Sequence, residues 1–163
     1  MIWKILFEGL VLSVLLVLWC LIGIRRGAVG LVFLYSRAVQ ERCISLGLTT
    51  AETIRRRARI FRIGGLAFYL AYVMLCVYGL NGARGFAAGF WQMFAILEIC
   101  NLCDRLLVDA WWVGRTRCWI IPGTEDLMPY ITRRDKCIKW LKGTLGMAAI
   151  AAILAAVMAL LLR

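Results

Sequence analysis

Four long apolar runs dominate the pattern of hydrophobic and polar positions along the chain. They cover about residues 5–24, 63–80, 86–103 and 143–162. A helix rises about 1.5 Å per residue, so each run is long enough to cross the ~30 Å hydrocarbon core of a bilayer. Lipid admits only helices and closed barrels, and the sequence lacks the short alternating strands of a barrel. The pattern therefore predicts an all-α fold, a transmembrane bundle of four helices.

Two capping boxes predict where polar extensions of these helices begin. Thr49 is followed by Glu52, and Thr132 is followed by Asp135, so in each pair one side chain can bond the backbone of the other. Helices are therefore expected to start near Thr49 and Thr132, well before the second and fourth apolar runs. The third run is expected to continue as a helix that stops at Gly114. Three of the four helices would thus extend beyond the membrane.

Residues 27–46 do not have a single prediction. The apolar stretch 27–35 is too short to span a membrane. It is either a continuation of the first helix, bent near its glycines, or an amphipathic segment that lies at the interface. Gly47 is predicted to end the helix that follows this stretch. The sequence leaves the role of residues 27–46 open.

Residues 115–131 form the only substantial segment without a helix prediction. Residues 116–121 are half apolar and typical of extended chain. Pro122-Gly123 predicts a tight turn in which Gly123 has a positive φ. The segment is therefore expected to be one ordered loop between the third and fourth helices.

The distribution of charge predicts how the four helices are oriented across the membrane. Seventeen of the 20 Lys and Arg residues lie in residues 25–62 and 104–142, and the other three are Lys4, Arg84 and Arg163. Membrane proteins concentrate basic residues in cytoplasmic loops, so both segments are predicted to be cytoplasmic. Both termini are then outside, and residues 1–163 form one domain of a cytoplasmic (inner) membrane. Anionic headgroups account for the net charge of +11, and no nucleic-acid partner is expected.

Five side chains share one helical face where the third apolar run meets the cytoplasm. At about 100° per residue, they fall within roughly 80° of one another. This polar stripe consists of Glu98, Asn101, Arg105, Asp109 and Trp112. Lipid offers no hydrogen bonds, so the stripe is expected to face protein.

Two interpretations of the stripe are open. Arg105 and Asp109, spaced i and i+4, would simply form an ion pair at the interface. Alternatively the stripe lines a ligand pocket in which Arg105 clamps a phosphate or carboxylate. In that pocket Asn101 fixes the orientation of the ligand, and Trp112 forms an apolar wall. Glu98 lies inside the membrane boundary, so it must be paired, protonated or functional, as in a proton-coupled carrier.

The loop from Trp119 to Tyr130 is the second candidate. Trp119 and Thr124 are predicted to line the ligand site, and Glu125 and Asp126 join Asp109 as candidate catalytic bases. The alternative is an interfacial cap whose acids pair with nearby arginines, namely Arg115, Arg117 or Arg133. In either case, at least one of Trp119, Thr124, Glu125 and Asp126 is expected to contact Arg105 or Asp109.

The remaining chemistry is sparse. The chain has seven cysteines and no histidine, which removes the commonest general base and metal ligand near neutral pH. Cys100 and Cys103 form a C-x-x-C on the reducing side, away from the stripe, and are predicted to be reduced packing residues. No metal site and no cofactor are predicted.

Three functions follow from these observations. The leading one is a multi-pass membrane protein that binds an anionic small molecule or lipid headgroup at its cytoplasmic face, alone or as a subunit of an assembly. The second is an enzyme that acts on a lipid-linked phosphate, and the third is a carrier that uses Glu98. Alanine rows on the last helix favour close helix packing, within one chain or in a homo- or hetero-oligomer: Ala148, Ala152 and Ala156, with Ala151, Ala155 and Ala159.

Overall fold

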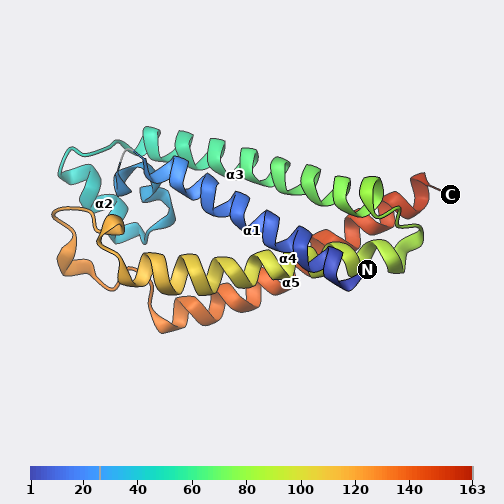
Figure 1. Cartoon of the computed structure of the whole chain (residues 1–163). Coiled ribbons are helices and arrows are strands. Elements are labelled where there is room, and N and C mark those ends of the chain that lie inside the picture. Colours follow the sequence, from blue (N-terminus) through green and yellow to red (C-terminus); the bar gives the residue numbers. More distant parts are fainter. Residues whose placement is uncertain (26, 163) are drawn as a thin grey trace.

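Four long helices form the molecule (Figure 1). This computed structural model describes residues 1–25 and 27–162; Arg26, Arg163 and the side chain of Arg133 lie outside the described part. Two of the helices continue as π-helix, from α3 into η2 and from α4 into η3. All four are long and apolar enough to cross a membrane, and the described residues contain no strand. The bounds are Ile2–Ile24 for α1, Ala51–Met74 for α3, Leu75–Leu80 for η2, Gly85–Cys103 for α4, Asp104–Val113 for η3 and Arg133–Leu161 for α5.

Both termini lie at the same end of the molecule (Figure 1). The opposite end carries the two long connections, with the short helices η1 (Ala28–Leu34) and α2 (Arg37–Ser45) and the loop after η3. Because these connections hold most of the basic residues, we call this the basic end. The prediction that both termini lie at one end and both long connections at the other is confirmed. The side of the membrane that each end faces stays a prediction.

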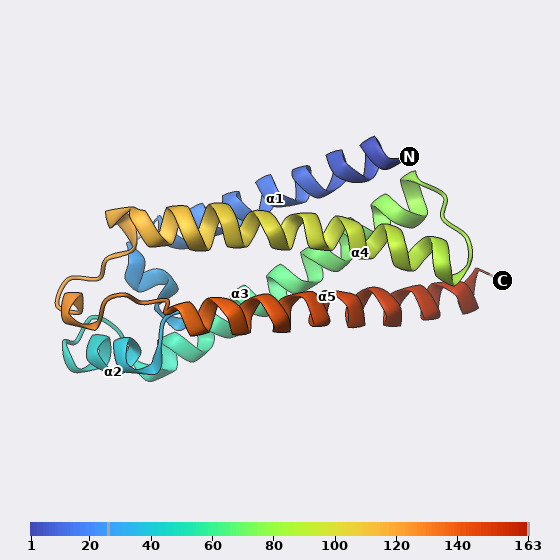
Figure 2. The same ribbon diagram turned by 90° about the horizontal axis from the view of Figure 1, so that it is seen from below.

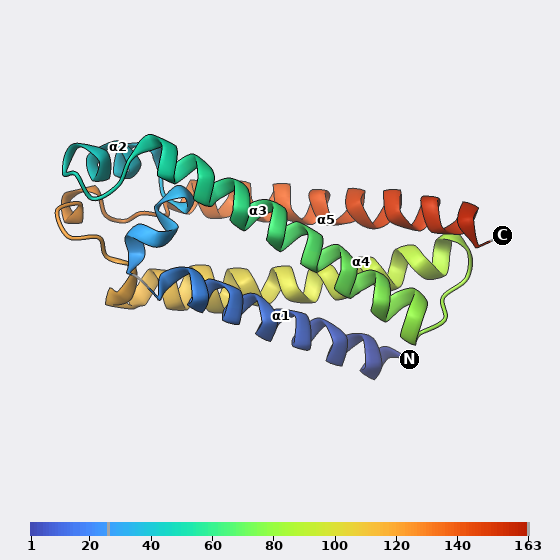
Figure 3. The same cartoon turned by 90° about the horizontal axis from the view of Figure 1, so that it is seen from above.

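Helix α4 is the centre of the packing. It lies between α1 and α5, and α5 runs antiparallel beside it (Figure 2). Helix α3 crosses the other helices obliquely (Figure 3). One alanine row of α5 packs within the chain, because Ala151 and Ala155 are fully buried and a Cβ on Gly89 of α4 would lie 3.6 Å from Ala155. Small residues thus allow α4 and α5 to approach closely. In lipid, such close packing stabilises helix association in place of the hydrophobic effect.

The buried apolar residues form two clusters. The membrane cluster lies between the long helices and includes Leu12, Val73, Met93 and Ile96. The basic-end cluster joins η1 and α2 to the start of α3 and to the loop after η3. Its buried members are Ala28, Leu31, Val32, Phe33, Tyr35, Val39, Cys43, Ile54, Trp119 and Ile121.

Residues 27–46 do not continue the first helix. The chain leaves the axis of α1 at Gly27, whose φ is 87°, so the first helix does not continue. η1 then folds back against α1 and α3, and Leu31 and Val32 are 1% exposed, which makes it a buried wedge. Its position relative to a membrane interface stays a prediction. A Cβ on Gly30 would lie only 2.6 Å from the Gly23 carbonyl oxygen. Two facing glycines therefore permit the close contact between η1 and α1.

Local signals located most helix boundaries correctly. The capping box of Thr132 and Asp135 is present in both directions. Gly47 has a φ of 70°, and the N–H groups of residues 47 and 48 bond back into α2, which is a Schellman stop. The start of α3 was predicted one residue early. Thr50, rather than Thr49, accepts the bond from the Thr53 amide.

The loop after η3 is ordered, with one difference from expectation. Gly123 has a φ of 85°, and the Thr124 amide bonds to the Ile121 carbonyl at 3.1 Å, so the predicted Pro-Gly turn is confirmed. The extended conformation predicted for residues 116–121 is interrupted. Residues Arg117–Trp119 make a single 3₁₀ turn, which the Ile120 amide closes on the Arg117 carbonyl at 3.0 Å.

Candidate functional site

The polar stripe faces α5, and its first members form a chain of hydrogen bonds. The Asn101 amide donates to Glu98 at 3.2 Å, and Arg105 Nε donates to Asn101 Oδ1 at 2.9 Å. From α5, Thr144 donates to Glu98 at 3.3 Å. The carboxylate therefore has protein partners inside the bundle, as expected, and we call this α4–α5 contact the polar seam.

Arg105 is the anchor of the polar seam. Its side chain is buried, donates to the Lys139 carbonyl and lies over the Trp140 ring, 5.2 Å from the centroid. The predicted ion pair with Asp109 is wrong, because Asp109 instead pairs with Lys139 at 3.1 Å. Gly143 makes room for this arrangement, since a Cβ there would overlap the Arg105 guanidinium. These contacts hold Arg105 between the helices rather than exposing it as a clamp.

The loop meets the stripe at its far end only. The Trp119 ring packs edge-on against Trp112 at 5.1 Å. The polar partners of Arg105 are Asn101 of α4 and the Lys139 carbonyl of α5, and Asp109 pairs with the Lys139 side chain. Thr124 is fully buried and bonds to the Ile121 carbonyl and the Tyr130 hydroxyl. The loop was expected to cover Arg105 and Asp109, but α5 covers these side chains instead.

The two loop acids are held at the surface. Asp126 pairs with Arg42 of α2 at 3.1 Å, and Glu125 accepts the Gly123 amide at 2.8 Å. Neither acid forms an ion pair with Arg115 or Arg117, and the side chain of Arg133, the third arginine proposed from sequence, lies outside the described part. Neither acid lines a cavity with Asp109. Among the described residues, no group of three or more His, Cys, Asp or Glu side chains is placed to hold a metal ion.

A cavity of about 340 Å³ opens between the long helices at the basic end, beside the seam; its lining is mostly apolar but includes four charged side chains. We call it the vestibule. Its charged walls come from three elements: Asp104 and Asp109 from η3, Arg62 from α3, and Lys139 from α5. Aromatic residues close its other side, namely Phe33, Tyr35, Phe61, Trp119 and Tyr130. Of the residues proposed from sequence, Asp109 and Trp119 line the vestibule.

Tyr35 ties the vestibule wall to the loop. Its hydroxyl donates to the Trp119 carbonyl at 2.6 Å, and its ring packs edge-on against Tyr130 at 5.1 Å. Burial raises the pKa of Tyr35, so the hydroxyl stays protonated and remains a donor at physiological pH. The wedge η1 and the loop thus close the vestibule together.

An apolar hollow of about 290 Å³ adjoins the vestibule. It lies between α1, α3 and α5 and includes Gly65, Leu66, Met147 and Ile150. Arg62 lines both spaces, at the point where they meet. The two spaces together offer an apolar arm and a charged chamber with a guanidinium between them.

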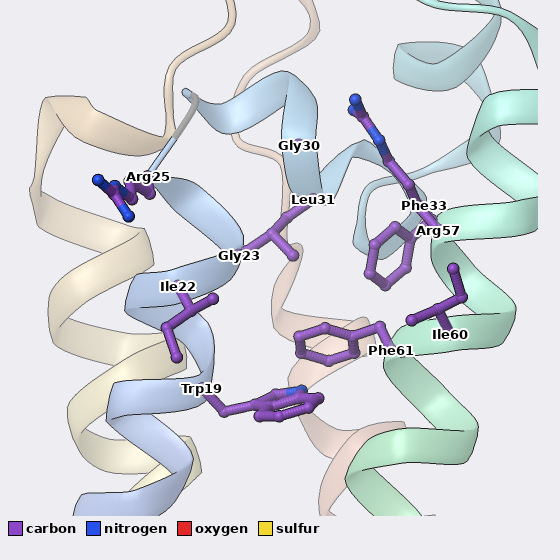
Figure 4. Close-up of a pocket in the computed structure, with 10 residues that line it drawn as sticks. All are labelled: Trp19, Ile22, Gly23, Arg25, Gly30, Leu31, Phe33, Arg57, Ile60 and Phe61. Atoms are coloured by element: carbon purple, nitrogen blue, oxygen red, sulfur yellow. The ribbon is translucent and has the colours of Figure 1, made fainter.

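A third hollow, the outer groove, lies between α1 and α3 and has a volume of about 520 Å³ (Figure 4). Arg25 stands at the end of α1 on one rim, and Arg57 stands on α3 at the other rim. Trp19 and Phe61 form its floor, with ring centroids 5.9 Å apart. Phe61 also lines the vestibule and the apolar hollow, so it separates the three spaces.

Asp104, Arg62, Tyr35 and Lys139 also line the vestibule. From the sequence, Asp104 is suggested only as a ligand of a hard cation and Arg62 only as a partner of Glu98, and Tyr35 and Lys139 have no predicted role. Asp104 is off the polar stripe, and the other three are distant in the chain. The one available signal was the density of ionisable residues from 104 to 109 directly after an apolar run. Periodicity on one helix does not identify which neighbouring elements complete a cavity.

No family model, curated protein or solved structure matches this chain.

Proposed function

We propose that this chain is a membrane protein that binds a lipid at its basic end through the anionic phosphate group of the lipid headgroup. The observation that carries the proposal is the position of Arg62 between the apolar hollow and the vestibule. A phospholipid places its phosphate between an apolar tail and a polar head. The tail, the phosphate and the polar head of a phospholipid therefore follow the same order as the apolar hollow, Arg62 and the vestibule.

Arg62 is also chemically suited to the phosphate. A guanidinium binds phosphate oxygens through two parallel hydrogen bonds. Lys139 forms an ion pair with Asp109, and Arg105 is hydrogen-bonded within the polar seam. Arg62 has no ion pair among the described residues. The binding role that the sequence predicts for Arg105 is thus better supported for Arg62.

The two alternative functions have less support. An enzyme that uses Asp109, Glu125 or Asp126 as a base would need one of them unpaired beside the ligand, and Asp109 and Asp126 are in ion pairs while Glu125 bonds to the loop backbone. A carrier that uses Glu98 would need that carboxylate to be free to exchange a proton, and it accepts hydrogen bonds from Asn101 and Thr144. Binding is therefore the function that we propose.

The test is lipid binding by the purified protein in detergent, measured by native mass spectrometry. Arg62→Gln should lower the affinity for phosphatidylglycerol by about tenfold, because a charge-assisted hydrogen bond is lost. Diacylglycerol, which lacks the phosphate, should bind weakly to both proteins. Arg59→Gln, on the same helix but outside the three hollows, is the matched control and should bind like the wild type.

Two further variants complete this test. Gly65→Leu should fill the apolar hollow and weaken lipid binding, because the tail loses its space. Arg57→Gln removes a cation from the outer groove and should leave the affinity unchanged. Loss of binding in Arg57→Gln together with normal binding in Arg62→Gln would move the site to the outer groove and overturn the proposal.

A further inference from the structure

One acidic group of the vestibule has no direct ion-pair partner among the described residues. Asp109 pairs with Lys139, with Nζ–O distances of 3.1 and 3.4 Å. Asp104, from the same helix, has no ion pair among the described residues. A partly buried carboxylate is costly unless it is paired or hydrogen-bonded, so a positive group bound directly beside Asp104 would stabilise it.

The surroundings of Asp104 favour an ammonium ion. The rings of Tyr35, Trp119 and Tyr130 line the same chamber, and aromatic faces attract ammonium groups. Trp119 is 3% exposed, and its indole N–H has no partner among the described residues. That donor is suited to an oxygen of the same ligand.

The charges then define the ligand. Arg62 stands where the apolar hollow meets the vestibule, and Asp104 lies within the vestibule. A molecule that satisfies both has a tail, then a phosphate, then an ammonium group. We propose that Asp104 makes the vestibule selective for a zwitterionic phospholipid with a primary ammonium group, which Asp104 binds while Arg62 binds the phosphate.

This inference rests on the proposed function and is tested by selectivity rather than by binding alone. Wild-type protein in detergent should bind phosphatidylethanolamine about tenfold more tightly than phosphatidylglycerol, which has the phosphate but no ammonium group. Asp104→Asn should remove this preference and leave the affinity for phosphatidylglycerol unchanged or higher. Asp126→Asn, which removes a carboxylate paired with Arg42 outside the vestibule, is the matched control and should keep the preference.

Three further outcomes make the result decisive. Phosphatidylcholine should bind less tightly than phosphatidylethanolamine, because its methylated nitrogen cannot donate to the carboxylate. Glycerophosphoethanolamine, the soluble headgroup, should compete poorly with phosphatidylethanolamine. If it bound as tightly as the whole lipid, the ligand would be a soluble phosphate compound rather than a lipid. Equal binding of both phospholipids, unchanged by Asp104→Asn, would overturn this inference and leave the proposed function intact. Phospholipid binding that survives Arg62→Gln would overturn both.

Discussion

At the residue scale, the polar seam holds a cation whose direct partners are all neutral. Arg105 bonds to an amide oxygen and a backbone carbonyl and lies over an indole ring. Removing one partner from such a network leaves a buried donor unsatisfied, which costs more than the net value of the bond itself. The seam is therefore sensitive to small changes in the space around the guanidinium.

Gly143 provides a sharp test of this sensitivity. Gly143→Ala should destabilise the protein by about 1–3 kcal/mol, because the added methyl group displaces Arg105 from its bond to the Lys139 carbonyl. Unfolding in detergent, followed by circular dichroism, measures the change. Gly146→Ala is the control: nothing lies within 4 Å of its Cβ position, so it should be neutral or stabilising. Equal stability of the two variants would show that Arg105 is not held as described.

At the scale of the elements, contact between α4 and α5 depends on small side chains. Ala155→Leu should destabilise the protein by about 1–3 kcal/mol, because a fully buried site facing Gly89 has no space for a larger group. Ala156→Leu, at the next and exposed position, should have little effect. Thermal unfolding of both variants in the same detergent checks this, and a greater loss in Ala156→Leu would place the contact on the other alanine row.

The elements themselves could be predicted wherever the signal was local. Long apolar runs, the Thr132 capping box and the Pro122-Gly123 turn depend on neighbours in the chain, and all three are present. The fold-back of η1 could not be predicted, because an apolar stretch does not specify the surface that will bury it. The pairing of Arg42 with Asp126 joins residues 84 positions apart, and no local pattern encodes it.

The candidate site divides in the same way. The sequence located the ionisable end of the third helix, and it proposed Asp109 and Trp119, which both line the vestibule. It assigned the role of anion clamp to Arg105, because stripe geometry identifies a shared face but not its partner. The identification of Arg62 and Asp104 required the helices to be placed around a common space.

At the scale of the whole molecule, the arrangement of charge predicts a topology. The termini share one end, and the basic connections share the other (Figure 1). A fluorescent protein that matures only in the cytoplasm, fused after Arg163, should therefore give no signal. The same reporter inserted at Gly123 should fluoresce, because the loop lies at the basic end. A bright fusion at Arg163 would reverse the orientation of the protein.

The two apolar clusters are expected to form in different environments, one in lipid and the other in water. The membrane cluster lies between helices that are long and apolar enough to cross a bilayer, and in lipid the burial of apolar surface gives little driving force, so packing decides stability. The basic-end cluster gathers η1, α2 and the loop in a region rich in arginine, where water drives its burial. Assembly is thus expected in two steps: the long helices insert and associate first, and the water-driven cap then closes over them. Since η1 and the loop form walls of the vestibule, this cavity is expected to exist only after the second step.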